Sequence, residues 1–435
     1  MESFSAYTNQ LGEFAGKVLL SPAGSYNTHE IQSSLFSARQ LELHLRSLIP
    51  ISELRDAGSF FTGDDLADEA VGLLPNSIAR SSIVVDPACG AGNLLIACSR
   101  KLPVNKSSLR KTLSDWGQCL FGLDLFEEFV ETTKLRLILE AVSRGVRPDL
   151  SDLNDAKGLL PHIQEGDAFE NEDVLKCATH VIVNPPYYKM PAGSSCEWAV
   201  GKINAAAKFM QHIADYTRPG TSVSAILPDV LRSGSRYEKW RGLIAEKLKC
   251  TIFPSGRFDQ KTDVDVFLLS AVVENSIDTP NWLGLGPVET CVGDFFEISI
   301  GPVVPYRDKQ DGEAVPYIHP KNLTVWDEIC DREITETWKY SGALKQPPFV
   351  AIRRTSSPSD TFRAAGTLVI GKQMIAAENH LIIARPKSGS IDDCRKLLRM
   401  LRNPDTNNFL NQRIRCRHLT VSAVREIPWV GGDVF

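Results

Sequence analysis

The sequence has no long hydrophobic run. None of its apolar stretches approaches the roughly 20 residues that a membrane-spanning helix needs. The amino terminus also lacks the charged and then apolar pattern of a secretory signal. We therefore expect a cytoplasmic protein with no membrane segment. The 435 residues are 43% hydrophobic, which is enough for well-buried cores in two or three domains.

Paired cysteines and repeats are also missing. The ten cysteines are scattered, without a CxxC pair and without a histidine at metal-ligand spacing. This spacing indicates neither a zinc site nor a disulfide framework, so we expect no metal and mostly buried thiols. The chain contains no internal repeat and no low-complexity tract.

The net charge of −5 is small but unevenly distributed. Residues 341–435 contain fifteen Lys or Arg against seven Asp or Glu, a balance of +8, so residues 1–340 carry −13. A basic carboxyl-terminal module on an acidic body suggests a polyanionic partner for that module.

Strand and helix patterns alternate along the first part of the chain. Apolar runs predict strands at residues 83–85, 120–124, 181–183, 223–227 and 264–269, and helices are predicted at 30–48, 127–143, 206–216 and 237–248. Their alternation predicts a doubly wound, mostly parallel α/β sheet. After about residue 276, Pro and Gly between short β-like runs predict a second, β-rich α+β module.

Four residues, Asn184, Pro185, Pro186 and Tyr187, follow the predicted strand at 181–183. The carboxyl ends of parallel strands are where ligands bind in open α/β sheets. The Asn184 side-chain carbonyl and a backbone carbonyl beside the prolines can each accept a hydrogen of an amine, while the prolines stiffen the backbone. Tyr187 offers a flat face on which a base can stack. Taken alone, the tetrapeptide also fits a turn that ends a strand.

A second motif extends from Asp86 through Gly90 and Gly92 into an apolar helical start. The glycines allow the backbone to approach a ligand closely, and the amides at the helix start favour an electronegative group. The pattern is not GxGxxG, and Asp86 before the turn argues against a Walker-type phosphate loop. A plain strand-to-helix turn is the alternative.

Two further acids lie at predicted strand ends. Asp124 ends the strand at 120–124, where a carboxylate would bind a ribose diol, with a solvated acid as the alternative. Asp167 lies in Gly-Asp-Ala-Phe, whose Phe169 is placed to cover an adenine ring.

The motifs together resemble a known family. Their order is Phe-Phe-Thr-Gly at 60–63, Asp-Pro-Ala-Cys-Gly-Ala-Gly-Asn-Leu at 86–94, Asp124, Gly-Asp-Ala-Phe at 166–169 and Asn-Pro-Pro-Tyr at 184–187. This order resembles the gamma-class amino DNA methyltransferases, which transfer methyl from S-adenosylmethionine to adenine N6, usually as the modification partner of a restriction system. The resemblance covers about residues 50–275 and implies a class I S-adenosylmethionine-dependent methyltransferase fold.

The resemblance also implies roles for individual residues. The implied donor contacts are Phe60, Phe61 and Thr62 for the methionine part, Asp86, Ala88, Gly90 and Gly92 for the amino acid end, Asp124 for the ribose, and Asp167, Ala168 and Phe169 for the adenine. The implied catalytic residues are Asn184 and Pro185 for the target amine, Pro186 in the same loop, and Tyr187 and Phe258 for the flipped base. The family often has its aromatic immediately after the acid, where this chain has Ala168.

The domains expected on this basis are an N-terminal helical segment at 1–50, a catalytic domain at 51–276 and a DNA target-recognition domain at 285–435. Arginines, hydroxyls and a histidine in predicted loops of the last domain suit phosphate contact and base reading, with a solvated basic face as the alternative. The candidate DNA contacts are Lys261, Arg353, Arg354, Arg413, Arg415 and Arg417. The expected partners are double-stranded DNA and a cognate restriction endonuclease.

Two other functions compete with this interpretation. Methyltransferases that act on glutamine amides or RNA bases also carry Asn-Pro-Pro-Tyr, although the basic module after the catalytic core favours DNA as the substrate. An inactive DNA-binding specificity protein is the alternative of another class. The intact donor loop and tetrapeptide argue against it, and donor binding separates the two.

Overall fold

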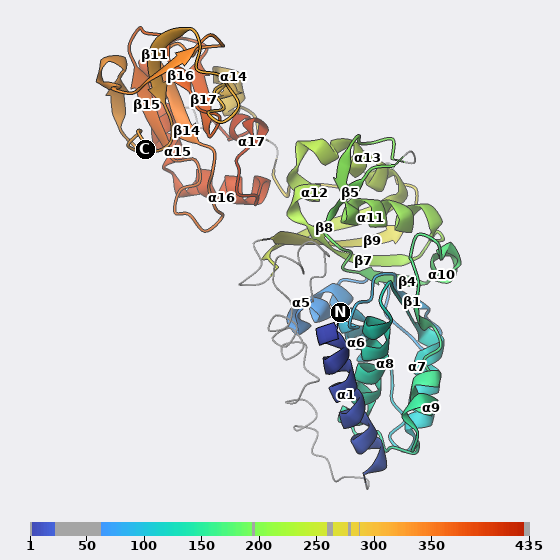
Figure 1. Cartoon of the computed structure of the whole chain (residues 1–435). Helices are drawn as coiled ribbons and strands as arrows, with labels where there is room; N and C mark the ends of the chain where they lie inside the picture. The colour runs from blue at the N-terminus through green and yellow to red at the C-terminus, as the bar shows by residue number, and fades with distance from the viewer. Residues whose placement is uncertain are drawn as a thin grey trace. The chain divides into compact units, whose positions relative to one another are not determined.

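The structure of the chain is a computed structural model that describes residues 2–21, 62–193, 196–258, 264–276, 280–286 and 288–429. The chain divides into two compact units, Met1–Trp282 and Leu283–Phe435 (Figure 1). The helix predicted at residues 30–48 lies outside the described residues. None of the helices within the described ranges is long and apolar enough to cross a membrane.

The first unit is built on a seven-stranded sheet with the order β3-β2-β1-β4-β7-β9-β8. Its strands are β1 (Val84–Asp86), β2 (Leu120–Asp124), β3 (Ile163–Glu165), β4 (His180–Val183), β7 (Ser222–Pro228), β8 (Leu248–Arg257) and β9 (Asp265–Val273). Neighbours from β3 to β7 pair in parallel, whereas β9 is antiparallel to both β7 and β8. The mostly parallel sheet predicted from the sequence is therefore confirmed.

Burial explains which strands the sequence predicted. All residues of β4 and β7 are buried, as expected of central strands that are covered on both faces and read as continuous apolar runs. Strand β8 was not predicted, because most of its residues are partly or fully exposed and Pro254 lies at a bulge. Such an edge strand has no continuous apolar run for a sequence pattern to detect.

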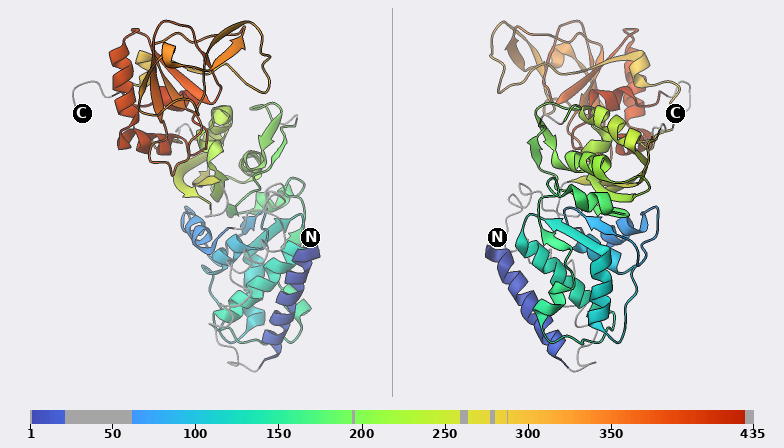
Figure 2. Two further views of the ribbon diagram at one scale, coloured as in Figure 1. Left: turned by 60° about the vertical axis from the view of Figure 1, so that its left-hand side comes forward. Right: turned by 90° about the vertical axis from the view of Figure 1, so that its right-hand side faces the viewer.

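Helices cover both faces of this sheet (Figures 1 and 2). They are α1 (Glu2–Leu20), α5 (Asp64–Gly72), α6 (Asn93–Ser99), α7 (Leu109–Cys119), α8 (Glu127–Ser143), α9 (Leu153–Gly158), α10 (Glu172–Cys177), α11 (Ala205–Tyr216), α12 (Asp229–Ser233) and α13 (Glu238–Lys247). Two short strands, β5 (Lys189–Pro191) and β6 (Lys202–Asn204), form a separate hairpin, and a 3-10 turn covers Ser235–Tyr237.

Helix α1 lies within the N-terminal helical segment expected at 1–50, although its own bounds were not predicted, and it packs along α8. Phe4, Tyr7 and Leu11 of α1 are fully buried against Phe129 and Leu135 of α8. The apolar residues of α1 recur at three- and four-residue intervals, so one face of the helix is buried in the first unit.

The second unit is β-rich, as the sequence predicted. Its strands are β10 (Phe296–Ile300), β11 (Glu313–Ile318), β12 (Glu328–Cys330), β13 (Thr337–Tyr340), β14 (Phe349–Arg353), β15 (Gly366–Ile370), β16 (Ala376–Ala377) and β17 (Leu381–Pro386). They form a five-stranded sheet, β10-β17-β14-β15-β12, and a three-stranded sheet, β13-β11-β16. The helices are α14 (Val292–Phe295), α15 (Ile391–Leu401), α16 (Pro404–Arg413) and α17 (Val421–Arg425), with a 3-10 turn at Asp331–Glu333.

Both faces of the five-stranded sheet are buried. Along β14, Val350 and Ile352 pack with the residues of α15 to α17, whereas Phe349 and Ala351 pack toward the three-stranded sheet. Because successive side chains of a strand point to opposite faces, β14 contributes to two hydrophobic clusters at once. The second unit therefore has its own core.

Candidate active site

The parallel strands bring the predicted motifs to one edge of the sheet. Asp124 ends β2, Asp86 ends β1, Asp167 follows β3 by two residues, and Asn184 follows β4 directly. Since β3, β2, β1 and β4 are consecutive neighbours, four motifs that are far apart in the chain meet along a single line of strand ends. This is the edge at which ligands bind in open α/β sheets.

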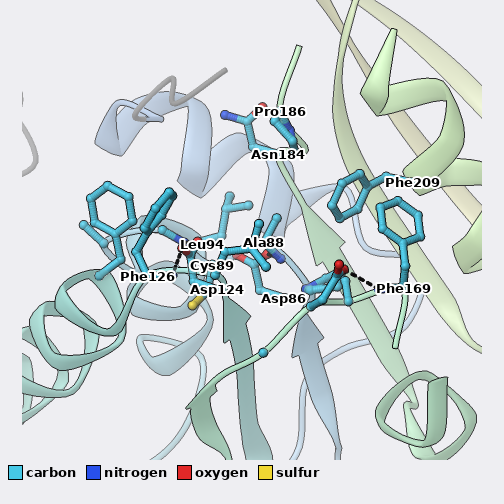
Figure 3. Close-up of a pocket in the computed structure, with 18 of the residues that line it drawn as sticks. Asp86, Ala88, Cys89, Leu94, Asp124, Phe126, Phe169, Asn184, Pro186 and Phe209 are labelled. Atoms are coloured by element: carbon cyan, nitrogen blue, oxygen red, sulfur yellow. Dashed lines mark hydrogen bonds between the residues drawn. The ribbon is translucent and has the colours of Figure 1, made fainter. Parts of the chain in front are cut away.

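A cavity of about 390 Å³ lies at this edge (Figure 3). Its lining residues are Thr62, Asp86, Pro87, Ala88, Cys89, Gly90, Ala91, Asn93, Leu94, Asp124, Leu125, Phe126, Phe129, Gly166, Asp167, Ala168, Phe169, Glu170, Asn184, Pro186, Tyr188, Met190, Lys208 and Phe209. Figure 3 shows Phe126 on one side of the Asp86 loop and Phe169 with Phe209 on the other, while Asn184 and Pro186 face the cavity from the end of β4.

The glycine-rich loop between β1 and α6 requires its glycine at position 92. Gly92 has φ +82°, and a Cβ there would lie 2.6 Å from Cγ2 of Thr133 on α8. The Thr133 hydroxyl in turn donates to the carbonyl of Gly90 at 2.8 Å. The close approach of the loop to α8 explains the glycine, because both the backbone conformation and the space exclude a larger residue.

Backbone amides of this loop bind the strand-end acids. The Ala88 amide donates to Asp86 Oδ1 at 3.1 Å, and the Gly90 amide donates to Asp124 Oδ2 at 2.9 Å. The Gly92 amide donates to the Cys89 carbonyl at 2.9 Å. The backbone at Ala88, Gly90 and Gly92, which the resemblance assigned to the amino acid end of the donor, therefore has amide partners within the chain. These contacts shape the loop that surrounds the cavity.

Burial makes the two carboxyl groups hard to ionise. It raises the pKa of Asp86 to about 8, an effect opposed by the Ala88 amide and increased by the charge of Asp124. Burial likewise raises the pKa of Asp124 to about 6, with the amides of Gly90 and Phe126 acting in the opposite direction. A positively charged ligand in the cavity would favour the ionised form of both acids.

Aromatic rings form one wall of the cavity. The rings of Phe169 and Phe209 lie 4.7 Å apart at 59°, and the Lys208 ammonium lies 4.8 Å from the centre of the Phe169 ring. His212 packs edge-on against Phe169 and lies with Nε2 3.0 Å from the Ala168 carbonyl, to which an Nε2–H donates. Phe169 is therefore held in place by its neighbours, and it lines the cavity.

Some cavity residues were missed by the sequence interpretation. Leu125 and Phe126 directly follow Asp124, line the cavity, and are 58% and 39% exposed, which is unusual for large apolar side chains. An apolar pair after a strand-end acid was the signal available in the sequence. Phe209 and Lys208 of α11 had no such signal, because only tertiary packing brings α11 next to Phe169.

Asn184 is held by hydrogen bonds on both sides of its amide. Its Nδ2 donates to Oγ1 of Thr62 at 2.9 Å, and its Oδ1 accepts from the Tyr187 hydroxyl at 2.7 Å. The same Tyr187 hydroxyl lies 3.1 Å from the carbonyl of Ile226 on β7. The amide is thus oriented by partners from a preceding segment and from its own loop.

The two candidate base-stacking residues lie near each other. The rings of Tyr187 and Phe258 are 6.3 Å apart and nearly perpendicular, at 83°. Tyr187 is 9% exposed and does not line the cavity, whereas the next residue, Tyr188, does. Pro185 is buried, and Pro186 lines the cavity. Phe60, Phe61 and Lys261, which were also predicted as site residues, lie outside the described residues.

The arginines predicted to contact DNA have different surroundings in the second unit. Arg413 forms an ion pair with Glu426, with Nε 2.5 Å and Nη2 3.0 Å from the carboxylate oxygens, and only 10% of its side chain is exposed. Arg353 donates from Nη2 to the carbonyls of Pro320 and Leu323. These contacts bind parts of the unit together and do not favour the predicted contact with phosphate.

The remaining arginines, Arg354, Arg415 and Arg417, belong to two segments that meet beyond the end of β14. Arg354 donates from Nη1 to the Asn379 carbonyl at 3.4 Å. Arg417 is exposed, Arg415 is half-buried, and the Arg417 carbonyl accepts from the Ser356 amide at 2.8 Å. The segment after Arg354 and the segment that carries Arg415 and Arg417 are therefore adjacent in the fold, and Thr355 and His418 form a β-bridge between them.

A recess of about 560 Å³ lies beside these segments in the second unit. It is lined by Tyr317, His319, Pro320, Lys321, Arg353, Thr355, Glu378 and His380. His380 Nδ1 lies 3.0 Å from Glu378 Oε1, and Lys321 is exposed. Three separate chain segments contribute polar side chains to this recess. Among its lining residues, only Arg353 was named as a candidate DNA contact from the sequence.

The fold of the chain is similar to those of several solved structures. The chain is similar to the type IIL restriction-modification enzyme MmeI in complex with DNA, with 12% identity, a TM-score of 0.51 and coverage of 92% of this chain and 72% of that one. It is also similar to the protein of the DrdV-DNA complex, with 13% identity, a TM-score of 0.50 and coverage of 93% and 58%. No curated protein sequence matches.

A further similarity is to a chain of a type I restriction-modification system, with 18% identity and a TM-score of 0.41. It covers 58% of this chain and 49% of the other, so the chain spans about half the length of that protein.

The family profile of N-6 DNA methylases matches residues 51–269, just over half of the chain. The sheet order and its antiparallel β9 are those of the class I S-adenosylmethionine-dependent methyltransferase fold, as the sequence motifs predicted. The matched residues include the glycine-rich loop, the strand-end acids and the Asn184 loop. The chain belongs to the N-6 DNA methylase family.

Proposed function

We propose that the chain is a site-specific DNA methyltransferase that transfers methyl from S-adenosylmethionine to N6 of a flipped adenine. The observation that carries this proposal is the single cavity at which Asp86, Asp124, Asp167 and Asn184 converge from neighbouring strand ends. The family supports the same reaction class. The modification half of a restriction system, with a cognate endonuclease as partner, is the setting that we infer.

The cavity fits the donor in size and charge. Its volume of about 390 Å³ lies within the range of about 300 to 1,000 Å³ usual for small-molecule sites. The donor carries positive charge, and the buried carboxyl groups of Asp86 and Asp124 are acceptors whose ionised forms that charge would stabilise. Asp124 would bind the ribose hydroxyls, and the Phe126 and Phe169 rings would cover the adenine from opposite sides.

The target amine would be bound by the Asn184 loop. An amide carbonyl oxygen can accept two hydrogen bonds, so Asn184 Oδ1 can bind an amine hydrogen beside the Tyr187 hydroxyl. The carbonyl of Pro185 would accept the second hydrogen. Both interactions strengthen as the nitrogen becomes positive in the transition state, which is the kind of contact that accelerates a reaction.

The bound donor would supply an activated methyl group to the amine held by Asn184 and the Pro185 carbonyl. The C–S bond would break as the C–N bond forms, and the proton lost from nitrogen would pass to water. The chain's own contribution is alignment, because positioning two reactants can account for several kcal/mol of a barrier, about 7 or more in favourable cases. Stacking of the flipped base is assigned to Tyr187 and Phe258. Their rings are perpendicular, so one of them must turn before both can face a planar base.

The second unit is proposed to bind the DNA target. Lys321, Thr355 and His380 line a recess next to the Arg417 segment, and this combination of donors suits phosphate oxygens and the acceptor edge of guanine. Arg354 and Arg417 belong to segments beside Thr355, and Arg415 is included with them in the proposed surface. We leave Arg413 out of this surface because its side chain is buried against Glu426.

The decisive experiment is methyl transfer from labelled S-adenosylmethionine to unmodified genomic DNA, with product nucleosides separated by chromatography. We expect N6-methyladenine with the wild-type protein and a rate lower by about 100- to 1,000-fold with Asn184→Ala, the usual cost of losing one transition-state hydrogen bond. Asn154→Ala, an exposed asparagine of α9, is the matched control and should retain full activity.

Other results would assign the protein differently. Label that enters RNA or protein, but not DNA, would favour a glutamine or RNA-base methyltransferase. Absence of donor binding to the intact protein would favour a DNA-binding protein without turnover.

A further inference from the structure

A chain of hydrogen bonds connects the interior of helix α8 to the Asn184 amide. Arg136 of α8 donates from Nη1 to Oδ1 of Asn93 and to the carbonyl of Ala91. Asn93 then donates from Nδ2 to the carbonyl of Thr62 at 2.5 Å. The Thr62 side chain completes the chain, because its Oγ1 accepts from Asn184 Nδ2 at 2.9 Å.

The members of this network before Asn184 are buried, although Thr62 and Asn93 also line the cavity. Arg136, Asn93 and Thr62 are 1%, 8% and 4% exposed. Because burial leaves little of their surface to water, these polar groups depend mainly on one another for their hydrogen bonds. Buried networks of this kind hold their members in one arrangement.

The network has a consequence for the chemistry of Asn184. The two ends of an asparagine amide differ, since one is a donor and the other an acceptor. A partner that binds the NH2 end also determines where the carbonyl end points. Here the Thr62 hydroxyl binds the NH2 end, and the carbonyl end is left beside the Tyr187 hydroxyl at the cavity.

We infer that Thr62 and Asn93 are positioning residues for the Asn184 carbonyl, with Arg136 anchoring Asn93. This inference rests on the proposed function, in which Asn184 binds the target amine. It gives Thr62 a role different from the contact with the methionine part of the donor that the sequence resemblance implied. It also couples the two halves of the site, because Asn93 begins α6 immediately after the glycine-rich loop.

The test separates donor binding from transfer. Thr62→Val removes the hydroxyl at nearly constant volume, and Thr62→Ser keeps it. We expect Thr62→Val to lower the single-turnover rate of DNA methylation by on the order of 100-fold, while the donor dissociation constant changes less than about threefold. Thr62→Ser should restore the rate to within about threefold of wild type, and thermal unfolding controls for folding.

A double variant tests the route of the effect. Because Thr62 would act through Asn184, Thr62→Val should cause no further loss in an Asn184→Ala background. Weaker donor binding with an unchanged single-turnover rate, or losses that add in the double variant, would overturn the inference and leave Thr62 as a donor contact.

One further measurement does not depend on activity. The Asn184 side-chain NH2 signal, identified in ¹⁵N spectra by its loss in Asn184→Ala, should shift and exchange faster in Thr62→Val but not in Thr62→Ser. An unchanged signal in Thr62→Val would contradict the inference even if the wild-type protein methylates DNA. Failure of the wild-type protein to methylate DNA would contradict the proposed function, and the signal would still decide the positioning role.

Discussion

The Tyr187 hydroxyl lies 2.7 Å from the side-chain carbonyl oxygen of Asn184, so one residue of the tetrapeptide orients another. Tyr187 thus has two separable groups, a hydroxyl that contacts Asn184 and a ring assigned to base stacking. We expect Tyr187→Phe, which keeps the ring, to lower the methylation rate by about 10-fold, and Tyr187→Ala to lower it by at least about 100-fold. Single-turnover kinetics measure both. Equal losses in the two variants would assign the whole effect to the hydroxyl.

The glycine at position 92 should be sensitive to substitution. Its φ of +82° and the 2.6 Å approach of Thr133 both oppose a side chain. We expect Gly92→Ala to lower the free energy of unfolding by about 2 to 4 kcal/mol. Chemical denaturation measures the difference. Gly158→Ala, at a glycine with no atom within 4 Å of the added Cβ, is the control and should change stability far less.

Donor binding should depend on pH through Asp86, whose pKa is raised to about 8. A cationic donor favours the ionised carboxylate, so its affinity should rise with pH, by up to about 10-fold per unit, until it levels off near pH 8. Calorimetry in buffers of different ionisation enthalpy should show proton release at pH 7. Asp86→Asn should bind weakly at every pH and release no proton from this group. An affinity of the wild-type protein that is independent of pH from 6 to 8 would contradict this assignment.

The raised pKa of Asp86 also affects the stability of the ligand-free protein. Folding raises the pKa of Asp86, so between about pH 4 and pH 8 the folded state holds a proton that the unfolded state has lost. The contribution of Asp86 to the free energy of unfolding is therefore greatest below its unfolded pKa and is lost as the pH rises through about 8. Denaturation at pH 6 and pH 8 should show a smaller pH dependence for Asp86→Asn than for the wild-type protein.

The exposed ring of Phe126 should contribute to donor binding. It is 39% exposed at the edge of the cavity, and covering it with a planar base would remove apolar surface from water. We expect Phe126→Ala to weaken donor binding by about 10-fold, as measured by calorimetry. Phe295→Ala in the second unit removes a ring of similar exposure, 40%, and should leave donor affinity unchanged. Similar affinities of Phe126→Ala and the wild type would remove Phe126 from the donor site.

The recess of the second unit should contribute to DNA binding. We expect Lys321→Ala with His380→Ala to weaken DNA binding by about 10-fold and to reduce its salt dependence by about one phosphate contact. Fluorescence titrations at several salt concentrations measure both quantities. Lys396→Ala, at an exposed lysine of α15, is the control for general charge.

Arg413 should contribute to stability and not to DNA binding, unlike Lys321 and His380. Arg413→Ala leaves Glu426 without its ion-pair partner in a partly buried position, so we expect a loss of stability in place of a specific loss of DNA affinity. If Arg413→Ala weakened DNA binding without a change in unfolding, Arg413 would return to the proposed DNA surface.

Local sequence patterns were sufficient to predict many helices and strands of the first unit. Helix α8 and strand β2 have the bounds that their patterns predicted, because most residues of both segments are buried and buried segments carry clear apolar patterns. The line of strand-end residues also followed from sequence, since parallel strands place their carboxyl ends on one edge. The bounds of helix α1 were not predicted, because within the expected N-terminal helical segment a helix was assigned only to residues 30–48. The edge strand β8 was missed because it lacks a continuous apolar run.

The sequence by itself determined the family, the α/β sheet and the motifs that surround the cavity, because short-range patterns encode strands, turns and residue types. Only the tertiary structure decided which side chains touch. It placed Phe209 against Phe169, joined Asn184 to Thr62 and Asn93, and buried Arg413 against Glu426. These pairs come from segments with no shared local pattern. Packing of the segments around the seven-stranded sheet creates the contacts in the first unit, and packing of α16 with α17 creates the Arg413 contact in the second.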